Sequence, residues 1–191
     1  MVKEPKPGRV KTRLGRDIGM TAAAWWFRHQ CARLLRRLQD PRWDLLLAVS
    51  PGRDGMQSRA WPRHIHRWPQ GRGDLGDRMG RAFRHAPGGP LVIVGADIPG
   101  ITSFHIAEAF RALGDHDAVV GPAPDGGYWL IGLARRVPPP PQLFDRVRWS
   151  TEHALDDTLA TLRGLRVACV ATLNDVDTAA DLTAKPAWDG R

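Results

Sequence analysis

The strongest constraint on the fold of this chain is an alternation of short apolar runs with longer stretches whose apolar residues recur at helical spacing. The apolar runs predict buried strands and lie at residues 43–49, 64–68, 91–96, 118–121, 128–133 and 165–173. Helical spacing covers residues 21–38, 74–86, 103–113 and 151–162. This alternation predicts an α/β fold with a mainly parallel sheet flanked by helices. Because ligands of such sheets bind where the strands end, polar residues directly after an apolar run are the first candidates for function.

Length and composition narrow the class of protein. A chain of 191 residues, 42% hydrophobic and 25% charged, is typical of a globular protein, and we expect residues 1–191 to form a single domain. The apolar runs are shorter than the roughly 20 residues of a membrane-spanning helix. Charges and prolines replace the apolar stretch of a signal peptide, so we expect a cytoplasmic protein. Cys31 and Cys169 lie far apart, which excludes a zinc site built from cysteines.

The formal charge of +8 is unevenly distributed along the chain. Residues 1–90 hold 19 basic and 7 acidic side chains, whereas residues 91–191 hold 9 basic and 13 acidic ones. A nucleic-acid-binding protein is expected to be basic more uniformly. The pattern therefore favours a phosphate-binding half joined to a half that holds a cation, and leaves a non-catalytic polyanion-binding protein as a remote alternative.

The first candidate site is a loop at residues 3–14, which holds three of the four lysines of the chain. Gly8 permits a turn whose N–H groups converge on an anion, and Lys6, Lys11 and Arg13 can bind phosphate oxygens. A frayed basic terminus is the alternative interpretation. Only residues 1–3 precede Glu4, and three residues are too few for a full strand. We therefore expect the first strand to be truncated.

Three aspartates directly follow predicted strands. Asp97 follows one apolar run, and Asp175 and Asp177 follow the last one. Carboxylates at strand ends can ligate a hard divalent cation. Asp97 could instead be a turn residue, and Asp177 or Thr178 could cap a short helix just downstream. We expect one of Asp175 and Asp177 to be a metal ligand and the other to be structural.

Two glycine-rich segments are weaker candidates. The first, a turn between two predicted strands, could place substrate hydroxyls against a carboxylate, or could be a purely structural hairpin. Its residues are Asp125, Gly126, Gly127 and Tyr128. The second lies at the start of a predicted helix, where free N–H groups can bind an anion or a nucleotide base. Its candidate nucleotide-binding residues are Gln70, Gly71 and Asp74.

Six motifs, taken together, resemble a known family in order and nearly end to end. They are G-R-V-K-T-R-L at 8–14, Q-G-R-G-D-L-G-D-R-M at 70–79, G-A-D-I-P-G at 95–100, P-A-P-D-G-G-Y-W-L-I-G-L at 122–133, W-S-T at 149–151 and N-D-V-D-T-A-A-D-L at 174–182. The chain resembles the selenodomain-associated transferases, small bacterial proteins commonly described as glycosyltransferases linked to arsenosugar biosynthesis. It is also similar to the 2-phospholactate guanylyltransferases, which share the K-T-R-L loop.

The resemblance implies a GT-A, or nucleotide-diphospho-sugar transferase, fold in which Mg²⁺ or Mn²⁺ holds the donor diphosphate. Lys11 and Arg13 would then meet donor phosphates, and Asp97 would be a metal-binding acid, which makes these three the predicted catalytic residues. Asp175 or Asp177 would be the second metal-binding acid. The segment 125–127 would be the substrate loop.

We therefore expect a metal-dependent transferase that uses a nucleotide-activated donor and a small-molecule acceptor. A glycosyltransferase that uses a nucleotide-diphospho-sugar is the first hypothesis. A nucleotidyltransferase that uses an NTP and a phosphorylated acceptor is the alternative, because a triphosphate needs several cations to stabilise its pyrophosphate leaving group. A homodimer is compatible with either hypothesis.

Overall fold

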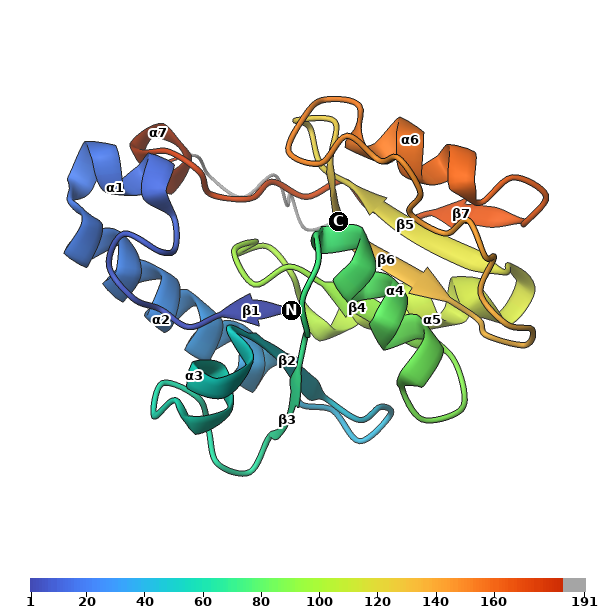
Figure 1. The fold of residues 1–191 in the computed structure, drawn as a ribbon, viewed down its shortest axis with the longest axis horizontal. Helices are drawn as coiled ribbons and strands as arrows, with labels where there is room; N and C mark the ends of the chain where they lie inside the picture. The colour runs from blue at the N-terminus through green and yellow to red at the C-terminus, as the bar shows by residue number, and fades with distance from the viewer. Residues whose placement is uncertain (184–191) are drawn as a thin grey trace. The chain divides into compact units, whose positions relative to one another are not determined.

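The computed structural model describes residues 1–183 and confirms an α/β fold with parallel strand pairing and flanking helices (Figure 1). Contacts within the chain separate two compact units. Unit 1 comprises Met1–Gly71, Gly95–Ser103 and the described residues from Asn174, and unit 2 comprises Arg72–Val94 and Phe104–Leu173. None of the helices within residues 1–183 is both long and apolar enough to cross a membrane.

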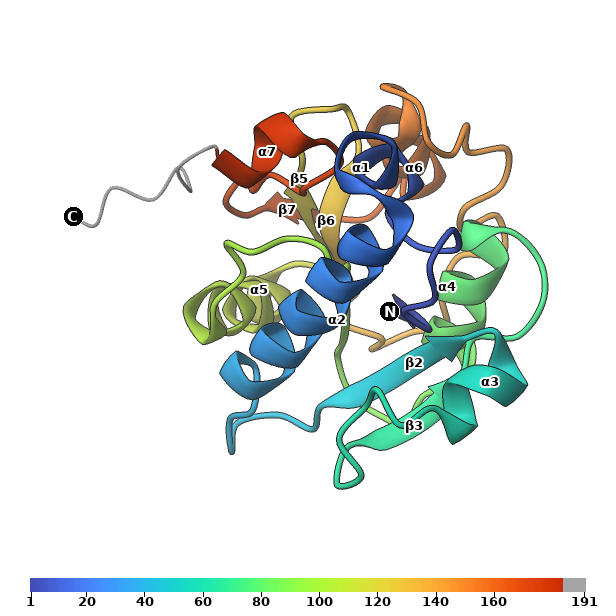
Figure 2. The ribbon, with the colours of Figure 1, turned by 90° about the vertical axis from the view of Figure 1, so that its left-hand side faces the viewer.

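Unit 1 is built on three parallel strands in the order β1-β2-β3. Its elements are β1 (Val2–Lys3), α1 (Thr12–Ile18), α2 (Met20–Arg37), β2 (Leu46–Ser50), α3 (Gly52–Gln57), β3 (His66–Pro69) and α7 (Ala179–Thr183). The first strand is short, and Val2 pairs with Val49. Figures 1 and 2 show α3 beside β2 and β3, and α7 beside α1.

Unit 2 contains four strands in the order β4-β6-β5-β7. Its elements are α4 (Leu75–His85), β4 (Leu91–Val94), α5 (Ser103–Asp115, whose first residue belongs to unit 1), β5 (Ala118–Pro122), β6 (Tyr128–Leu133), α6 (Ala154–Thr161) and β7 (Val167–Cys169). β6 runs antiparallel to β4 and β5, whereas β7 runs parallel to β5. The strand residues Val119, Val120, Leu130 and Ile131 are buried in the core of this unit.

Helix boundaries follow local chemistry. α2 buries residues at helical spacing, among them Phe27, Cys31, Leu34 and Leu35, which satisfies its apolar periodicity. α4 begins after Asp74, whose carboxylate accepts a hydrogen bond from the N–H of Asp77, while the Asp77 carboxylate accepts one from the N–H of Asp74. This reciprocal capping satisfies two N–H groups that the first turn of a helix would otherwise leave unpaired.

Two short helices, α1 and α3, were not predicted. α1 offers little apolar periodicity, because Leu14 is its only fully buried large side chain. α3 contains two glycines, which are poor helix formers. The apolar run at residues 165–173 forms a strand only at Val167–Cys169.

Candidate functional site

The candidate site lies in unit 1 and begins with Lys11, the residue that precedes α1. Lys11 adopts a left-handed backbone conformation, with φ 46° and ψ 49°, and its carbonyl accepts the N–H of Gly15. Few non-glycine residues adopt this conformation, because the Cβ crowds the following carbonyl. One turn into the helix, Leu14 is fully buried against Ala23 and Val176. This packing places the start of α1 against the segment that carries Asp175 and Asp177.

A main-chain hydrogen bond joins the two acidic segments. The N–H of Val176 donates to the carbonyl oxygen of Asp97, at 3.2 Å. The residues on either side of Val176 are Asp175 and Asp177, so this bond brings their carboxylates next to that of Asp97. The loop after β4 and the segment before α7 are thereby held together although they are far apart in sequence.

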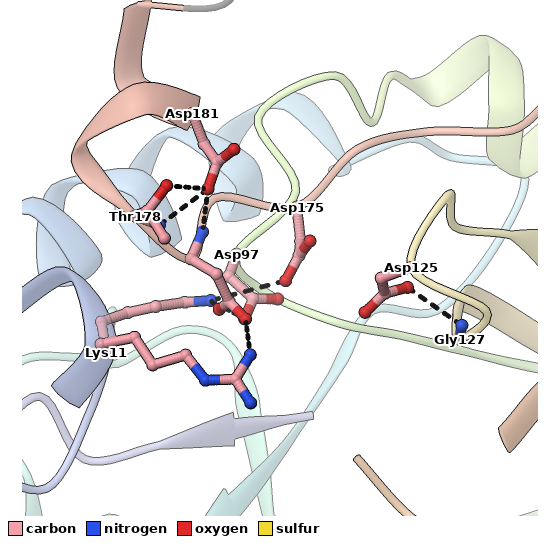
Figure 3. Close-up of polar contacts among 9 residues, drawn as sticks. Lys11, Asp97, Asp125, Gly127, Asp175, Thr178 and Asp181 are labelled. Carbon is pink, nitrogen blue, oxygen red and sulfur yellow. Dashed lines mark hydrogen bonds and ion pairs between the residues drawn. The ribbon is translucent and has the colours of Figure 1, made fainter. Parts of the chain in front are cut away.

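Asp181 caps the start of α7. Its Oδ2 accepts hydrogen bonds from the N–H groups of Asp177 and Thr178 and from the Thr178 hydroxyl, at 2.7 to 3.0 Å (Figure 3). A second carboxylate, that of Asp17 on α1, accepts the N–H of Ala179. Because these residues satisfy the start of the helix, the side chain of Asp177 is available to the acidic cluster.

Three carboxylates converge on the ammonium group of Lys11, as Figure 3 shows. The Lys11 Nζ lies 2.6 Å from Oδ2 of Asp97, 2.8 Å from Oδ1 of Asp177 and 3.8 Å from Oδ2 of Asp175. Arg13 donates from its Nη1 to Oδ2 of Asp177 at 3.0 Å. The Lys11 side chain is only 7% exposed, whereas that of Arg13 is 66% exposed. We call these five residues the lysine–aspartate cluster.

Electrostatic interactions within the cluster keep Lys11 and Asp177 ionised. Burial lowers the pKa of Lys11, but the charges and hydrogen bonds of Asp97 and Asp177 outweigh it and raise that pKa above its ordinary value. Burial raises the pKa of Asp177, but its contacts with Lys11 and Arg13 outweigh this and hold the pKa below its ordinary value. At neutral pH the cluster therefore contains a cationic Lys11 beside the ionised carboxylate of Asp177.

The carboxylates of this cluster have the chemistry that a hard divalent cation requires. One oxygen from each of Asp97, Asp175 and Asp177 lies within 4.8 Å of the others. Such oxygens are ligands that Mg²⁺ and Mn²⁺ accept. The ammonium of Lys11 already occupies the position at which these oxygens converge, so a cation is electrostatically favourable there. The residues present thus fit the predicted metal site.

Comparisons with known proteins place the chain in a family. Residues 34–151, more than half of the chain, match the profile of a family described as "Uncharacterized protein conserved in bacteria (DUF2064)". The chain belongs to this family. A crystal structure from Desulfovibrio desulfuricans G20, described as a "putative nucleotide-diphospho-sugar transferase", is 35% identical, with a TM-score of 0.84. The similarity covers 95% of this chain and 81% of that one. A search of curated proteins finds no significant match.

In this family member, the other predicted phosphate-binding residues of the loop have separate environments. Lys6 is exposed and forms ion pairs with Glu4 and Asp54, at 3.0 and 2.8 Å, rather than with the lysine–aspartate cluster. Gly8 has the positive φ, 72°, that its predicted turn requires. Sequence spacing could not have revealed the role of Asp54, because it lies on α3, a helix that was not predicted.

The predicted nucleotide-binding segment at 70–74 has clear structural roles. The Gln70 side chain donates to the carbonyl oxygens of Val2 and Ala48, at 3.0 and 2.9 Å, and so ties β1 to β2. Gly71 has a φ of 82°, and Asp74 caps α4. Gln70 and Gly71 belong to unit 1 and Asp74 to unit 2. Their binding of a nucleotide stays a prediction.

The predicted substrate loop lies in unit 2 and forms a tight turn. Oδ1 of Asp125 accepts the N–H of Gly127 at 2.9 Å (Figure 3), and Gly126 has a φ of 81°. The hydroxyl of Tyr128 accepts a hydrogen bond from Thr158, and burial raises the pKa of this tyrosine. The turn matches the hairpin geometry that the sequence allowed, and its contact with substrate stays a prediction.

Proposed function

We propose that this protein is a metal-dependent transferase that takes a group from a nucleotide-activated donor and passes it to a small acceptor. A glycosyltransferase that uses a nucleotide-diphospho-sugar is the first choice. The observation that carries the proposal is the convergence of Asp97, Asp175 and Asp177 on one cation position, which the Lys11 ammonium occupies, with Arg13 paired to Asp177. The similarity to a structure described as a "putative nucleotide-diphospho-sugar transferase" supports it.

The cluster is suited to a diphosphate. Asp97, Asp175 and Asp177 would hold Mg²⁺ or Mn²⁺, which when bound neutralises diphosphate charge and stabilises the leaving group. Arg13 is mostly exposed and uses one terminal nitrogen on Asp177, so its remaining N–H groups can donate to phosphate oxygens. Positioning and charge neutralisation would then provide most of the rate enhancement.

In this proposal the turn at Asp125 to Tyr128 binds the acceptor. Asp125 uses Oδ1 in the bond to Gly127, and its second carboxylate oxygen, Oδ2, is not part of that bond. A carboxylate oxygen can accept hydrogen bonds from acceptor hydroxyls.

Nucleotidyl transfer from an NTP is the second candidate, and the paired cations Lys11 and Arg13 favour it. Both side chains already contact the same carboxylate, that of Asp177, so both lie next to the proposed metal position. Two cations and a metal ion match the charge that develops on a pyrophosphate leaving group. The two reactions release different products, a nucleoside diphosphate or pyrophosphate.

Thermal unfolding with a panel of UDP-, GDP- and CDP-sugars and the four NTPs tests the proposal. A donor at about 100 times its Kd stabilises the folded protein by roughly 2.7 kcal/mol, and we expect this shift only with Mg²⁺ or Mn²⁺ present. Asp97→Asn should abolish the shift. Asp54→Asn is the matched control, because Asp54 pairs with Lys6 outside the lysine–aspartate cluster.

The class of donor that gives the shift separates the two reactions, and the released product identifies the activity. If folded wild-type protein shows no metal-dependent shift with any donor, the proposal is refuted. It is also refuted if Asp97→Asn shifts as much as the wild type.

A further inference from the structure

Lys11 occupies the position at which the three carboxylates of the cluster converge. Its Nζ contacts all three, and the side chain is more than nine-tenths buried. The exposed Arg13 pairs with Oδ2 of Asp177, whereas Lys11 pairs with Oδ1 of the same carboxylate. A divalent ion bound by the oxygens that Lys11 contacts would compete with the ammonium for their lone pairs, and the two cations would repel each other at close range. A divalent ion bound by these oxygens therefore requires the Lys11 ammonium to leave.

From this placement we infer that Lys11 is a built-in competitor for the metal, whose ammonium must leave the carboxylates before a divalent ion can bind. This inference rests on the proposed function, because the proposed donor supplies the phosphates that receive the displaced ammonium. It adds a regulatory role for Lys11 to the proposed binding of phosphate.

The charge balance favours such an exchange. Within the lysine–aspartate cluster three carboxylates face two cations, and the departure of Lys11 removes one of these two positive charges. A divalent ion more than replaces the lost charge. An ammonium that leaves the carboxylates but stays buried needs a new anionic partner, because an unpaired buried charge is unfavourable. Phosphate oxygens provide that partner, and the flexible four-carbon stem of lysine allows the movement.

The backbone conformation of Lys11 is consistent with a side chain held in one place by its ion pairs. Its left-handed conformation is unfavourable for a residue with a Cβ. The folded structure nevertheless holds this conformation, and the ammonium lies against the carboxylates of Asp97 and Asp177. The metal-free cluster is thus a stable arrangement that a ligand must open.

Two ligands that favour the same displaced state of Lys11 bind cooperatively. The metal needs Lys11 to leave the carboxylates, and the donor phosphates attract it. Each ligand must therefore raise the affinity for the other by the same factor. Metal alone should bind weakly to the wild-type protein, which limits occupation of the site until a donor arrives.

Binding of Mn²⁺ alone, measured by the loss of the free-ion signal in electron paramagnetic resonance, tests the inference without any nucleotide. We expect Lys11→Met to bind Mn²⁺ at least tenfold more tightly than the wild type. Lys3→Met, the same substitution at an exposed lysine of β1, should bind like the wild type. Lys11→Met/Asp97→Asn should lose the gain, which locates the ion at the cluster. Lys11→Gln, which keeps a polar end, replaces Lys11→Met if circular dichroism shows the latter unfolded.

Three other outcomes would contradict the inference. If folded Lys11→Met or Lys11→Gln binds Mn²⁺ no more tightly than the wild type, the inference is wrong. If the wild type and the folded Lys11 variant bind Mn²⁺ equally, and Asp97→Asn removes this binding, Lys11 does not compete with the metal. The metal site of the proposed function then stands. If no variant binds Mn²⁺, the competition is refuted, and the donor-dependent thermal shift separately decides the proposed function.

Discussion

Substitution of Gly126 by alanine should strongly destabilise unit 2. Gly126 lies in the turn at Asp125 to Tyr128 with a φ of 81°, which is unfavourable for alanine. A Cβ at this position would overlap the carbonyl oxygen of Glu152 and would lie 2.5 Å from its carbonyl carbon. Because these are main-chain atoms, no rotation of a flexible side chain can relieve the overlap.

The cost has two parts. The left-handed backbone alone costs an alanine about 1 kcal/mol. To relieve the overlap the turn must open, which weakens the bond from Leu155 N–H to the Gly126 carbonyl and the bond from Gly127 N–H to Asp125, both 2.9 Å long. Each such bond contributes about 1 kcal/mol. The free energy of unfolding should therefore fall by about 3 kcal/mol.

Gly164→Ala provides the matched control. Gly164 lies in the same unit with a φ of 88°, but a Cβ there meets no atom within 4 Å. It should cost only the backbone strain, about 1 kcal/mol. Urea unfolding followed by circular dichroism measures both variants. If the two free energies of unfolding lie within about 0.5 kcal/mol of each other, the steric reasoning is refuted.

Three further predictions concern unit 1. Because its pKa is lowered in the folded state, Asp177 contributes stability at neutral pH that is lost as the pH falls below the ordinary aspartate value. Urea unfolding should show wild type more stable than Asp177→Asn by on the order of 1 kcal/mol at pH 6, and a constant difference down to pH 2.5 would contradict this. Arg67→Ala should lower the free energy of unfolding by about 2 kcal/mol, because the guanidinium donates to three main-chain carbonyls. Lysine cannot match that geometry, so full stability in Arg67→Lys would count against this reasoning. Burial raises the pKa of Cys31 to about 12. A thiol reagent at pH 8 should therefore modify the exposed Cys169 alone in the folded protein. Rapid modification of both thiols would overturn the reasoning.

The features that the sequence predicted correctly depend on local patterns. Apolar runs located the strands, because burial between helices leaves a signature in consecutive residues. Asp74 marked the start of a helix for the same reason, since capping involves residues only three positions apart. Asp97, Asp175 and Asp177 were predicted from their places after apolar runs, and the structure brings all three together.

What was not predicted depends on long-range contacts. The pairing of Lys6 with Asp54 and the use of Gln70 as a link between strands arise from tertiary packing. The expected division between Asp175 and Asp177 into one ligand and one structural residue assumed that a residue of this segment had to cap the next helix with its own side chain. Asp181 caps that helix and both carboxylates lie in the cluster, while which of the two binds a metal stays a prediction.

The hydrogen bond between Lys11 and Asp177 joins residues 166 positions apart. During synthesis, the ribosome must add a further 166 residues after Lys11 before the second partner of this bond exists. Unit 2, by contrast, is complete in sequence once Leu173 has been made, and units of this size generally begin to fold while the chain is still growing. The three strands of unit 1 can pair early, but the lysine–aspartate cluster can close only when the last segment arrives. Assembly of the proposed metal position is therefore a late event, and a nascent chain that stops short of Asn174 would carry Lys11 and Asp97 without the carboxylates that complete it.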